Sequence, residues 1–262
     1  MRQEKRGYVK LCKTIRFSAV KDHAKNQRNE HPILDDPRWR QLPHHLNHLH
    51  EKAAEQLGTS GGGNHFVEWV SLAVQEDNPL DLEGGNYIAL VSHSGSRAVG
   101  FTIANWYTKV AEQYCAFLPK EFIRLAWLEY QTSAAEEYEL AMNLAGDFAR
   151  ANHEVIHQRI SEALGADLVL ATLENHHNFA WRVERPHQAP IYIHRKGATP
   201  PKDVLGIIRL DGYAGFFARV GRDGRGASSN TPRSTARHMG AGGCSAVTKP
   251  SKSCRPRMCA NN

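Results

Sequence analysis

The sequence predicts an α+β fold, and three observations lead to that class. Apolar residues recur at spacings of three or four along residues 133–164, which predicts one long amphipathic helix. Short apolar runs that end in polar loops are typical of strands, and the chain has FVEWVSLAV, NYIALVSH, LVLATL and APIYIHRK. Strands and helices do not alternate as regular βαβ units, so we expect an α+β fold rather than a doubly wound one.

The predicted elements follow one another in a simple order. HHLNHLHEKAAEQL is a short helical pattern that Gly58 closes. The Gly-rich loop GTSGGGNH then leads into the first strand, and the second strand ends in the loop SHSGSR. Between Phe101 and Tyr130 the pattern is helical, and the long helix over residues 133–164 follows. Functional polar groups often lie where strands break into loops, so these loops are where we expect a site.

Composition excludes several classes of protein. The chain has 262 residues, of which 41% are hydrophobic and 23% charged, and this is enough to bury a sizeable core. Disordered chains, collagens and small disulfide scaffolds have other compositions. No run approaches the roughly 18 apolar residues of a membrane span, and the basic N-terminus lacks a signal-peptide run. Five scattered cysteines predict reduced thiols, so we expect a soluble, cytoplasmic protein with no membrane partner.

The net charge of +6 is unevenly distributed along the chain. From Arg209 onward there are ten Lys or Arg against two Asp or Glu, whereas the preceding residues carry 23 against 25. A basic tail rich in Arg, Gly and Ser is more typical of a poorly ordered segment than of an RNA-binding patch. We therefore expect a polar N-terminal segment over residues 1–56, a core over 57–208 and a tail over 209–262.

Three histidines differ from the others because each stands at the end of an apolar run. They are His65 in GNHFVE, His93 in SHSGSR and His177 in NHHNF. Imidazoles offered from three separate loops suit a borderline metal such as zinc or manganese. The alternative for each is a hydrogen-bonded structural histidine.

Glycines and cations share these loops. Gly61 and its neighbours, together with Gly95, let the backbone approach an anion closely. Arg97, Arg195 and Lys196 add the positive charges that phosphate recognition requires. The alternative is ordinary turn chemistry, which uses the same residue types.

Five ordered motifs carry a resemblance to a known family. GTSGGGNHFVE, SHSGSRAVG, YELAMNLAGDFARAN, NHHNFAWRV and IHRKGAT, in this order and at these separations, resemble the RtcB family of RNA ligases. The resemblance covers residues 35–208. It implies a fold of mixed sheets with surrounding helices that is incomplete here, with residues 1–56 replacing part of the family's N-terminal region.

The resemblance implies an RNA ligase that uses GTP and one or two manganese ions, in RNA repair or tRNA splicing. Such an enzyme joins an RNA 3'-phosphate or 2',3'-cyclic phosphate to a 5'-hydroxyl through a guanylylated histidine. Carried over by motif, the metal ligands are His65, His93 and His177. The GMP or GTP site comprises Asn64, His65, Phe66, Val67, Glu68, His177 and Asn178. The residues at the RNA phosphates are Arg97, Arg195 and Lys196.

Two motifs of the family differ in this sequence. The family's Asp-x-Gly-Cys-Gly-Met motif, which completes the metal site, is missing, and this predicts truncation at the N-terminus. After LGIIR the family continues with Pro-Gly-Ser-Met and later His-Gly-Ala-Gly-Arg, whose His is guanylylated. Here RHMGAGGC makes His238 the candidate nucleophile, although Met239 intrudes and Gly243 replaces the Arg. One choice of codons for residues 209–215 restores Gly-Ser-Met in the next frame, so we hypothesise a frame shift near Ile208.

Two other functions remain open at this point. The first alternative is a non-catalytic remnant that binds metal or nucleotide. The second is a three-histidine metal hydrolase with Glu68 as general base. GTP dependence separates the ligase from the hydrolase. The sequence does not determine which RNA is used or the oligomeric state.

Overall fold

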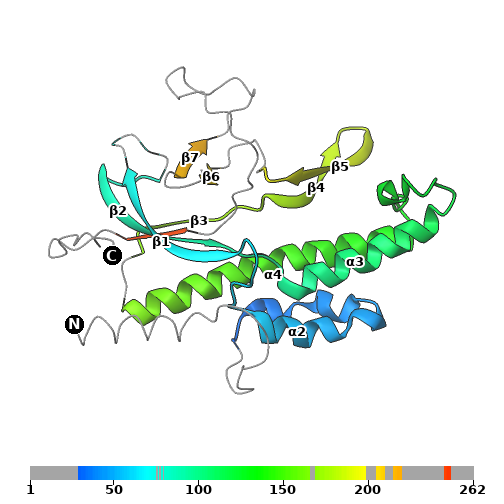
Figure 1. The fold of residues 1–262 in the computed structure, drawn as a ribbon, viewed down its shortest axis with the longest axis horizontal. Coiled ribbons are helices and arrows are strands. Elements are labelled where there is room, and N and C mark those ends of the chain that lie inside the picture. The colour runs from blue at the N-terminus through cyan, green and yellow to red at the C-terminus, as the bar shows by residue number, and fades with distance from the viewer. Residues whose placement is uncertain are drawn as a thin grey trace. The chain divides into compact units, whose positions relative to one another are not determined.

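The computed structural model describes residues 29–198, except 75, 77, 79 and 166–168, and the backbone of strands at 205–209, 215–219 and 245–248. The chain divides into two compact units. Unit 1 comprises residues 1–66 and 94–160, and unit 2 comprises 67–93 and 161–262. In the described part, unit 1 is mainly helical and unit 2 mainly strands, which confirms the predicted α+β class (Figure 1).

Unit 1 is built from three α-helices and four short 3-10 helices of the described chain. The α-helices are α2 (His48–Gln56), α3 (Arg97–Tyr114) and α4 (Ser133–Leu164), whose last four residues belong to unit 2. The 3-10 helices are η1 (Pro32–Asp35), η2 (Pro37–Gln41), η3 (His44–Leu46) and η4 (Ile123–Leu125). Pro stands at the start of η1 and η2, where a backbone N–H is not needed.

The sequence pattern predicted the bounds of α4 correctly but not those of α3. The bounds of α4 coincide with the predicted residues 133–164. The predicted helical pattern from Phe101 to Tyr130 is confirmed as far as Tyr114 and wrong beyond it, because α3 ends there and only the short η4 follows before α4. The chain turns at buried Cys115, whose Sγ accepts a hydrogen bond from the backbone N–H of Trp127 at 3.4 Å. Pro119 lacks the N–H that a continuing helix requires.

The core of unit 1 lies among α2, α3 and α4, which run side by side (Figure 1). Phe148 and Leu144 of α4 are fully buried there, beside Val99 and Ile103 of α3. The segment before α2 looks polar in the sequence, yet it contributes some of the most buried side chains. These are Ile33, Trp39, Leu42 and Leu46.

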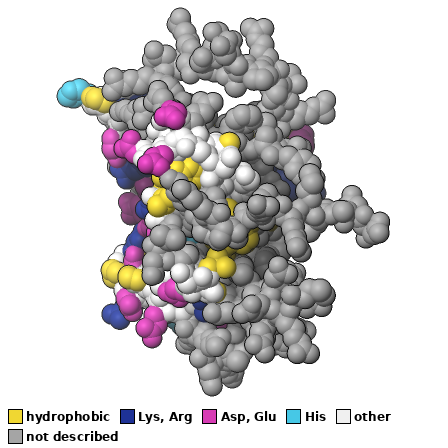
Figure 2. All heavy atoms as spheres, turned by 90° about the vertical axis from the view of Figure 1, so that its left-hand side faces the viewer, with side chains coloured by type: hydrophobic (Ala, Val, Ile, Leu, Met, Phe, Trp, Pro, Cys, Tyr) yellow, Lys and Arg dark blue, Asp and Glu magenta, His cyan; other side chains and the backbone are white. Residues whose placement is uncertain are grey.

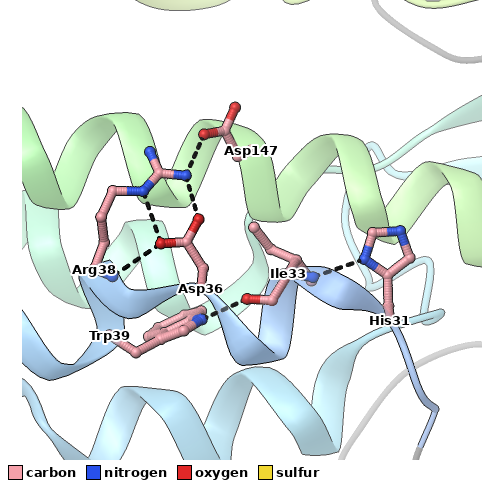
Figure 3. A network of polar contacts seen from close by, with 6 residues as sticks. All are labelled: His31, Ile33, Asp36, Arg38, Trp39 and Asp147. Carbon is pink, nitrogen blue, oxygen red and sulfur yellow. Dashed lines mark hydrogen bonds and ion pairs between the residues drawn. The ribbon is translucent and has the colours of Figure 1, made fainter.

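A polar network attaches this N-terminal segment to α4 (Figure 3). The Arg38 guanidinium donates to both oxygens of Asp36, at 3.0 and 2.6 Å, and to Asp147 of α4 at 2.6 Å. Beneath it, the indole N–H of Trp39 donates to the carbonyl of Ile33 at 2.7 Å. The segment is therefore held both by buried apolar area and by charge-assisted hydrogen bonds.

Replacing Asp36 by Asn should weaken unit 1 and change its response to acid. The hydrogen bonds from Arg38 hold the pKa of Asp36 below its ordinary value. A carboxyl of this kind stabilises the fold above its unfolded pKa of about 4, and that contribution is lost as the pH falls toward the folded pKa. We expect Asp36→Asn to lower the unfolding free energy at neutral pH by about 1 kcal/mol and to remove this part of the acid dependence.

The measurement is urea unfolding at several pH values, followed by tryptophan fluorescence. Asp147→Asn is the matched control, because the Asp147 side chain is 50% exposed and makes one of these bonds. Its effect should be smaller. Equal losses for the two variants would contradict the assignment of the lowered pKa to the Asp36–Arg38 pair.

The described residues of unit 2 form a four-stranded sheet and two hairpins. The sheet has the order β1 (Phe66–Val74), β2 (Gly85–His93), β8 (Ser245–Thr248) and β3 (Ala171–Leu173), in which β8 is antiparallel to β2 and β3. The hairpins are β4 (Asn178–Arg185) with β5 (Gln188–Lys196), and β6 (Leu205–Arg209) with β7 (Gly215–Arg219). Tyr87 and Ala89 of β2 are buried against apolar residues of β1.

The predicted strands at β1, β2, β3 and β5 are confirmed, whereas β4 was missed because NFAWRVER follows a polar loop without a long apolar run. Within residues 209–262 the structure describes β7 and β8 and the last residue of β6, and the remainder lies outside the described residues. No helix in the described part of the chain is long and apolar enough to cross a membrane.

Candidate functional site

The Gly-rich loop after α2 turns sharply at two glycines. Gly58 has φ +74° and is buried, and a Cβ there would lie 2.7 Å from Val155 Cγ1 of α4. Gly61 has φ +94°, and a Cβ there would collide with the Arg97 guanidinium and lie 2.6 Å from His65 Nδ1. Both positions require glycine for conformation and for space. Arg97 and His65 therefore both pack over the backbone of Gly61.

Asn152 of α4 joins this loop to the loop before α3. Its side-chain oxygen accepts hydrogen bonds from the backbone N–H groups of Gly58 at 2.7 Å and Thr59 at 3.1 Å. Its amide nitrogen donates to the Thr59 carbonyl and to Ser94 Oγ, both at 3.0 Å. The next residue, His153, accepts from the Ser94 backbone N–H through Nε2 at 3.1 Å. Two consecutive residues of one helix thus bind both loops.

Arg97 begins α3 in an uncommon conformation. Its φ of +53° lies in the left-handed region, which a non-glycine residue occupies only when the surrounding structure enforces it. The side chain is half-buried, and its Nε donates to Thr59 Oγ1 at 3.2 Å. Burial lowers the pKa of this guanidinium, which nevertheless stays charged at neutral pH. Arg97 therefore presents a fixed, partly desolvated positive charge beside a glycine backbone.

Gly61→Ala should destabilise unit 1, whereas Gly62→Ala should not. Alanine at position 61 meets the Arg97 guanidinium and a positive φ, while a Cβ at Gly62 has nothing within 4 Å. We expect a loss of about 1–2 kcal/mol for Gly61→Ala, and a change within about 0.5 kcal/mol for Gly62→Ala. Chemical denaturation of both variants tests this. Similar stabilities would mean that Arg97 moves away at little cost.

In unit 2, two predicted metal ligands lie together. His93 ends β2 and His177 precedes β4, and both are buried. Their ring centroids are 5.1 Å apart with the planes inclined at 54°. The backbone at His177 is held by the Ala198 N–H, which donates to the His177 carbonyl at 3.1 Å. This arrangement brings two imidazoles from separate elements to one place.

The hairpin of β4 and β5, which begins directly after His177, carries the predicted phosphate-binding residues Arg195 and Lys196. Asn178 pairs with Lys196 across the strands, and its side-chain oxygen accepts from the Gly197 N–H at 2.9 Å. Arg195 is half-buried, with its Cζ 5.8 Å from the centre of the Trp181 ring, a cation–π arrangement. Its Nε is buried without a hydrogen-bond acceptor among the described residues. Lys196 is exposed.

The remaining predicted site residues are distributed over both units. Asn64, His65 and Phe66 belong to unit 1, and Val67 and Glu68 to unit 2. The candidate nucleophile, His238, lies outside the described residues. In the described ranges no group of three or more His, Cys, Asp or Glu is arranged to hold a metal ion. What the structure brings together is Arg97 with the Gly-rich loop in unit 1, and His93 with His177 in unit 2.

Charge is mixed on the face that Figure 2 presents, where acidic side chains lie beside basic ones. The residues before Arg209 carry slightly more acidic than basic side chains. Binding of an anion by this part of the chain therefore depends on local cations such as Arg97, Arg195 and Lys196 rather than on a broad basic surface.

Three buried polar residues at the Gly-rich loop were not singled out from the sequence. They are Thr59, Asn152 and His153. A signal was present for Asn152, because a polar residue occupies a position in the apolar stripe of α4. Thr59 and His153 carry no such signal, since the Thr59 hydroxyl accepts from the Arg97 side chain and His153 accepts from the backbone of Ser94, and both partners lie far along the chain.

A family model described as "tRNA-splicing ligase RtcB" matches residues 3–210. This is more than half of the chain, and it extends upstream of residue 35, where the resemblance in the motifs begins. The match includes the loop around Gly61, the Arg97 loop, α4 and the hairpin that carries Arg195.

Several curated relatives are named "tRNA-splicing ligase RtcB". The protein from Pyrococcus horikoshii is 27% identical over 221 residues, which cover 72% of this chain and 25% of the relative. Those from Aeropyrum pernix and Nanoarchaeum equitans are 29% and 27% identical, covering 56% and 58% of this chain and 34% and 35% of the relative. The chain therefore spans between a quarter and about a third of the length of these relatives.

Proposed function

Because the chain belongs to the RtcB family, we propose that it is a cytoplasmic RNA ligase acting in tRNA splicing or RNA repair. Its substrates are RNA ends that carry a 3'-phosphate or 2',3'-cyclic phosphate, and RNA ends that carry a 5'-hydroxyl. It uses GTP and manganese. The relatives' names support the ligase and the RNA class, and the residues of this chain support phosphate binding.

The observation that carries the proposal is the environment of Arg97. Its guanidinium is half-buried and hydrogen-bonded to Thr59, and within the described chain no carboxylate contributes to its lowered pKa. A cation that is partly desolvated without a counter-charge is costly, and a bound anion removes much of that cost. The guanidinium fork matches the oxygens of a phosphate. We therefore assign Arg97 to the RNA 3'-phosphate, with Arg195 and Lys196 as further phosphate contacts.

The metal assignment rests on the chemistry of the donors. His93 and His177 are buried imidazoles whose ring centroids lie 5.1 Å apart, and neutral imidazoles suit a divalent ion such as manganese. We propose that this pair, with His65, holds one or two manganese ions. A bound divalent ion supplies charge neutralisation at phosphate oxygens, which the attack of a nucleophile on a triphosphate requires.

The proposed nucleotide site follows the motifs. Asn64, Phe66, Val67, Glu68 and Asn178 line it, together with His65 and His177. A nitrogen of His238 attacks the α-phosphorus of GTP, and pyrophosphate leaves. The RNA 3'-phosphate then takes the GMP from His238, and the 5'-hydroxyl displaces GMP as the new phosphodiester forms. The proton of the 5'-hydroxyl passes to water in this last step.

The test is to incubate the purified chain with manganese and GTP labelled on its α-phosphate, then denature it and measure bound label. We expect label on the wild type and none on His238→Ala. His48→Ala is the matched control, because His48 is exposed at the start of α2. Ligation of a 3'-phosphate RNA to a 5'-hydroxyl RNA is then measured with the same three proteins.

The outcomes separate the proposal from the two other functions. Absence of label on a folded chain that still binds GTP would contradict ligation and favour a binding remnant. Metal-dependent hydrolysis without GTP, abolished by Glu68→Gln, would favour the hydrolase. Label that persists in His238→Ala would move the nucleophile to another residue.

A further inference from the structure

We propose that Asn152 is a positioning residue that holds the loops of residues 58–61 and 94–97 together and thereby orients Arg97. It does not itself touch the ligand. The inference rests on the proposed function in one respect, because the ligand for which Arg97 is oriented is the RNA 3'-phosphate. The connection between Asn152 and Arg97 stands on the geometry of unit 1 alone.

Asn152 is completely buried and uses both ends of its side-chain amide. The oxygen accepts from Gly58 and Thr59, and the nitrogen donates to Thr59 and Ser94, at distances of 2.7 to 3.1 Å. An amide in this position cannot be replaced by an apolar side chain without leaving several buried backbone groups without partners. The two loops are therefore fixed to α4 by one side chain.

The contact to Arg97 passes through Thr59. Asn152 binds both the N–H and the carbonyl of Thr59, which fixes the peptide groups on either side of that residue's Cα. The Thr59 hydroxyl donates to the Gln56 carbonyl at 2.6 Å, so its lone pairs point in a set direction. Arg97 Nε donates to this hydroxyl at 3.2 Å. Displacement of Thr59 therefore displaces the acceptor that orients the guanidinium.

A second connection runs through Ser94, on the loop that leads to Arg97. Ser94 Oγ accepts from Asn152 and donates to the Ser60 carbonyl at 2.7 Å, while the Ser94 N–H donates to His153. The two loops are thus hydrogen-bonded to each other as well as to α4. This double attachment is consistent with the left-handed φ at Arg97, which requires a well-determined surrounding structure.

The test compares Asn152→Asp with Asn143→Asp. Aspartate has the shape of asparagine but cannot donate to the Thr59 carbonyl and repels it, so the loop should move. Asn143 lies about two and a half turns earlier on the same helix and provides the same chemical change away from the loops. The first readout is the NMR signal of the Arg97 Nε–H in the ligand-free chain. We expect its exchange with water to accelerate at least tenfold in Asn152→Asp and not in Asn143→Asp.

The second readout is the ratio of dissociation constants for a short single-stranded RNA with a 3'-hydroxyl and with a 3'-phosphate. This ratio reports recognition of the terminal phosphate and is insensitive to general RNA binding. We expect Asn152→Asp to reduce the ratio at least tenfold. Affinity for the 3'-hydroxyl RNA should change less than twofold, which a merely unstable protein would not show.

A second pair of variants covers the case in which Asn152→Asp fails to fold. Thr59→Val keeps the shape of the side chain and every bond of Asn152. It removes the acceptor of Arg97 and, with it, the hydrogen bond from the Thr59 hydroxyl to the Gln56 carbonyl. It should accelerate exchange of the Arg97 Nε–H and reduce the ratio in the same way. Thr59→Ser keeps a hydroxyl at this position. Compared with Thr59→Val, it should return both the Arg97 Nε–H exchange rate and the ratio of dissociation constants most of the way to the wild-type values.

These outcomes distinguish the inference from the proposed function. An Arg97 Nε–H signal that is unchanged in folded Asn152→Asp would overturn the positioning role, and one that is unchanged in Thr59→Val would overturn the path through Thr59. If that signal changes as expected while the wild type shows no preference for the 3'-phosphate, the positioning role holds and the assigned ligand is wrong.

Discussion

Replacing Arg97 by Gln should reduce affinity for 3'-phosphate RNA by roughly 10- to 100-fold. A charge-assisted contact at a half-buried site contributes about 1.5–3 kcal/mol, and each 1.4 kcal/mol is a factor of ten. RNA with a 3'-hydroxyl should bind the variant nearly as well as the wild type, because it lacks the anion that Arg97 binds. The measurement is a titration of both RNAs at several salt concentrations.

Arg124→Gln is the matched control for this loss of charge. Arg124 lies on η4 of the same unit and is exposed, so its removal changes the net charge without changing the site. Arg97→Lys should recover only part of the affinity, since a point charge replaces the planar fork and the bond to Thr59 is lost. Equal losses for Arg97→Gln and Arg124→Gln would show that charge alone is being measured.

Replacing Phe148 by Ala should destabilise unit 1 by about 3–5 kcal/mol. The Phe148 side chain is completely buried in the core of unit 1. Its ring packs edge to face against the ring of Trp39, with the ring centroids 6.3 Å apart. Removing the ring loses buried apolar area, the aromatic contact and the packing of surrounding side chains. Since small domains are stable by roughly 5–15 kcal/mol in total, this is a large share.

Chemical denaturation followed by tryptophan fluorescence measures the effect. Phe101→Ala is the matched control, because Phe101 is on α3 of the same unit and 69% exposed. Its unfolding free energy should change by no more than about 0.5 kcal/mol. A loss below about 1 kcal/mol for Phe148→Ala would contradict the described core.

The strength of the sequence pattern differs between elements for physical reasons. The helix α4 was predicted to the residue because its apolar stripe continues over many turns and repeats the same spacing. The end of α3 was not, because its terminus depends on Cys115 and Trp127, which meet only after the chain has turned back. Similarly, β4 is defined by its pairing with β5 rather than by an apolar run of its own.

Some residues of the candidate site could likewise be predicted from the sequence, whereas others could not. His93, His177 and Arg97 could be singled out because each has an unusual residue type at the end of an apolar run or in a Gly-rich loop. Asn152 could not be assigned a role, because its hydrogen-bond partners lie up to 94 residues away. The same holds for Thr59, whose hydroxyl acts through the side chain of Arg97 in another loop. Hydrogen bonds of that kind leave no local pattern.

The sequence by itself determined the α+β class, the long helix, several strands and the family, because periodicity and motif order are properties of consecutive residues. Only the tertiary structure decided that the polar-looking segment before α2 supplies Trp39 and Leu46 to the core, and that Arg97 is held through Thr59. It also decided which imidazoles lie together, since His93 and His177 belong to separate elements. Burial and hydrogen bonding depend on which distant segments meet, and that is settled only when the chain folds.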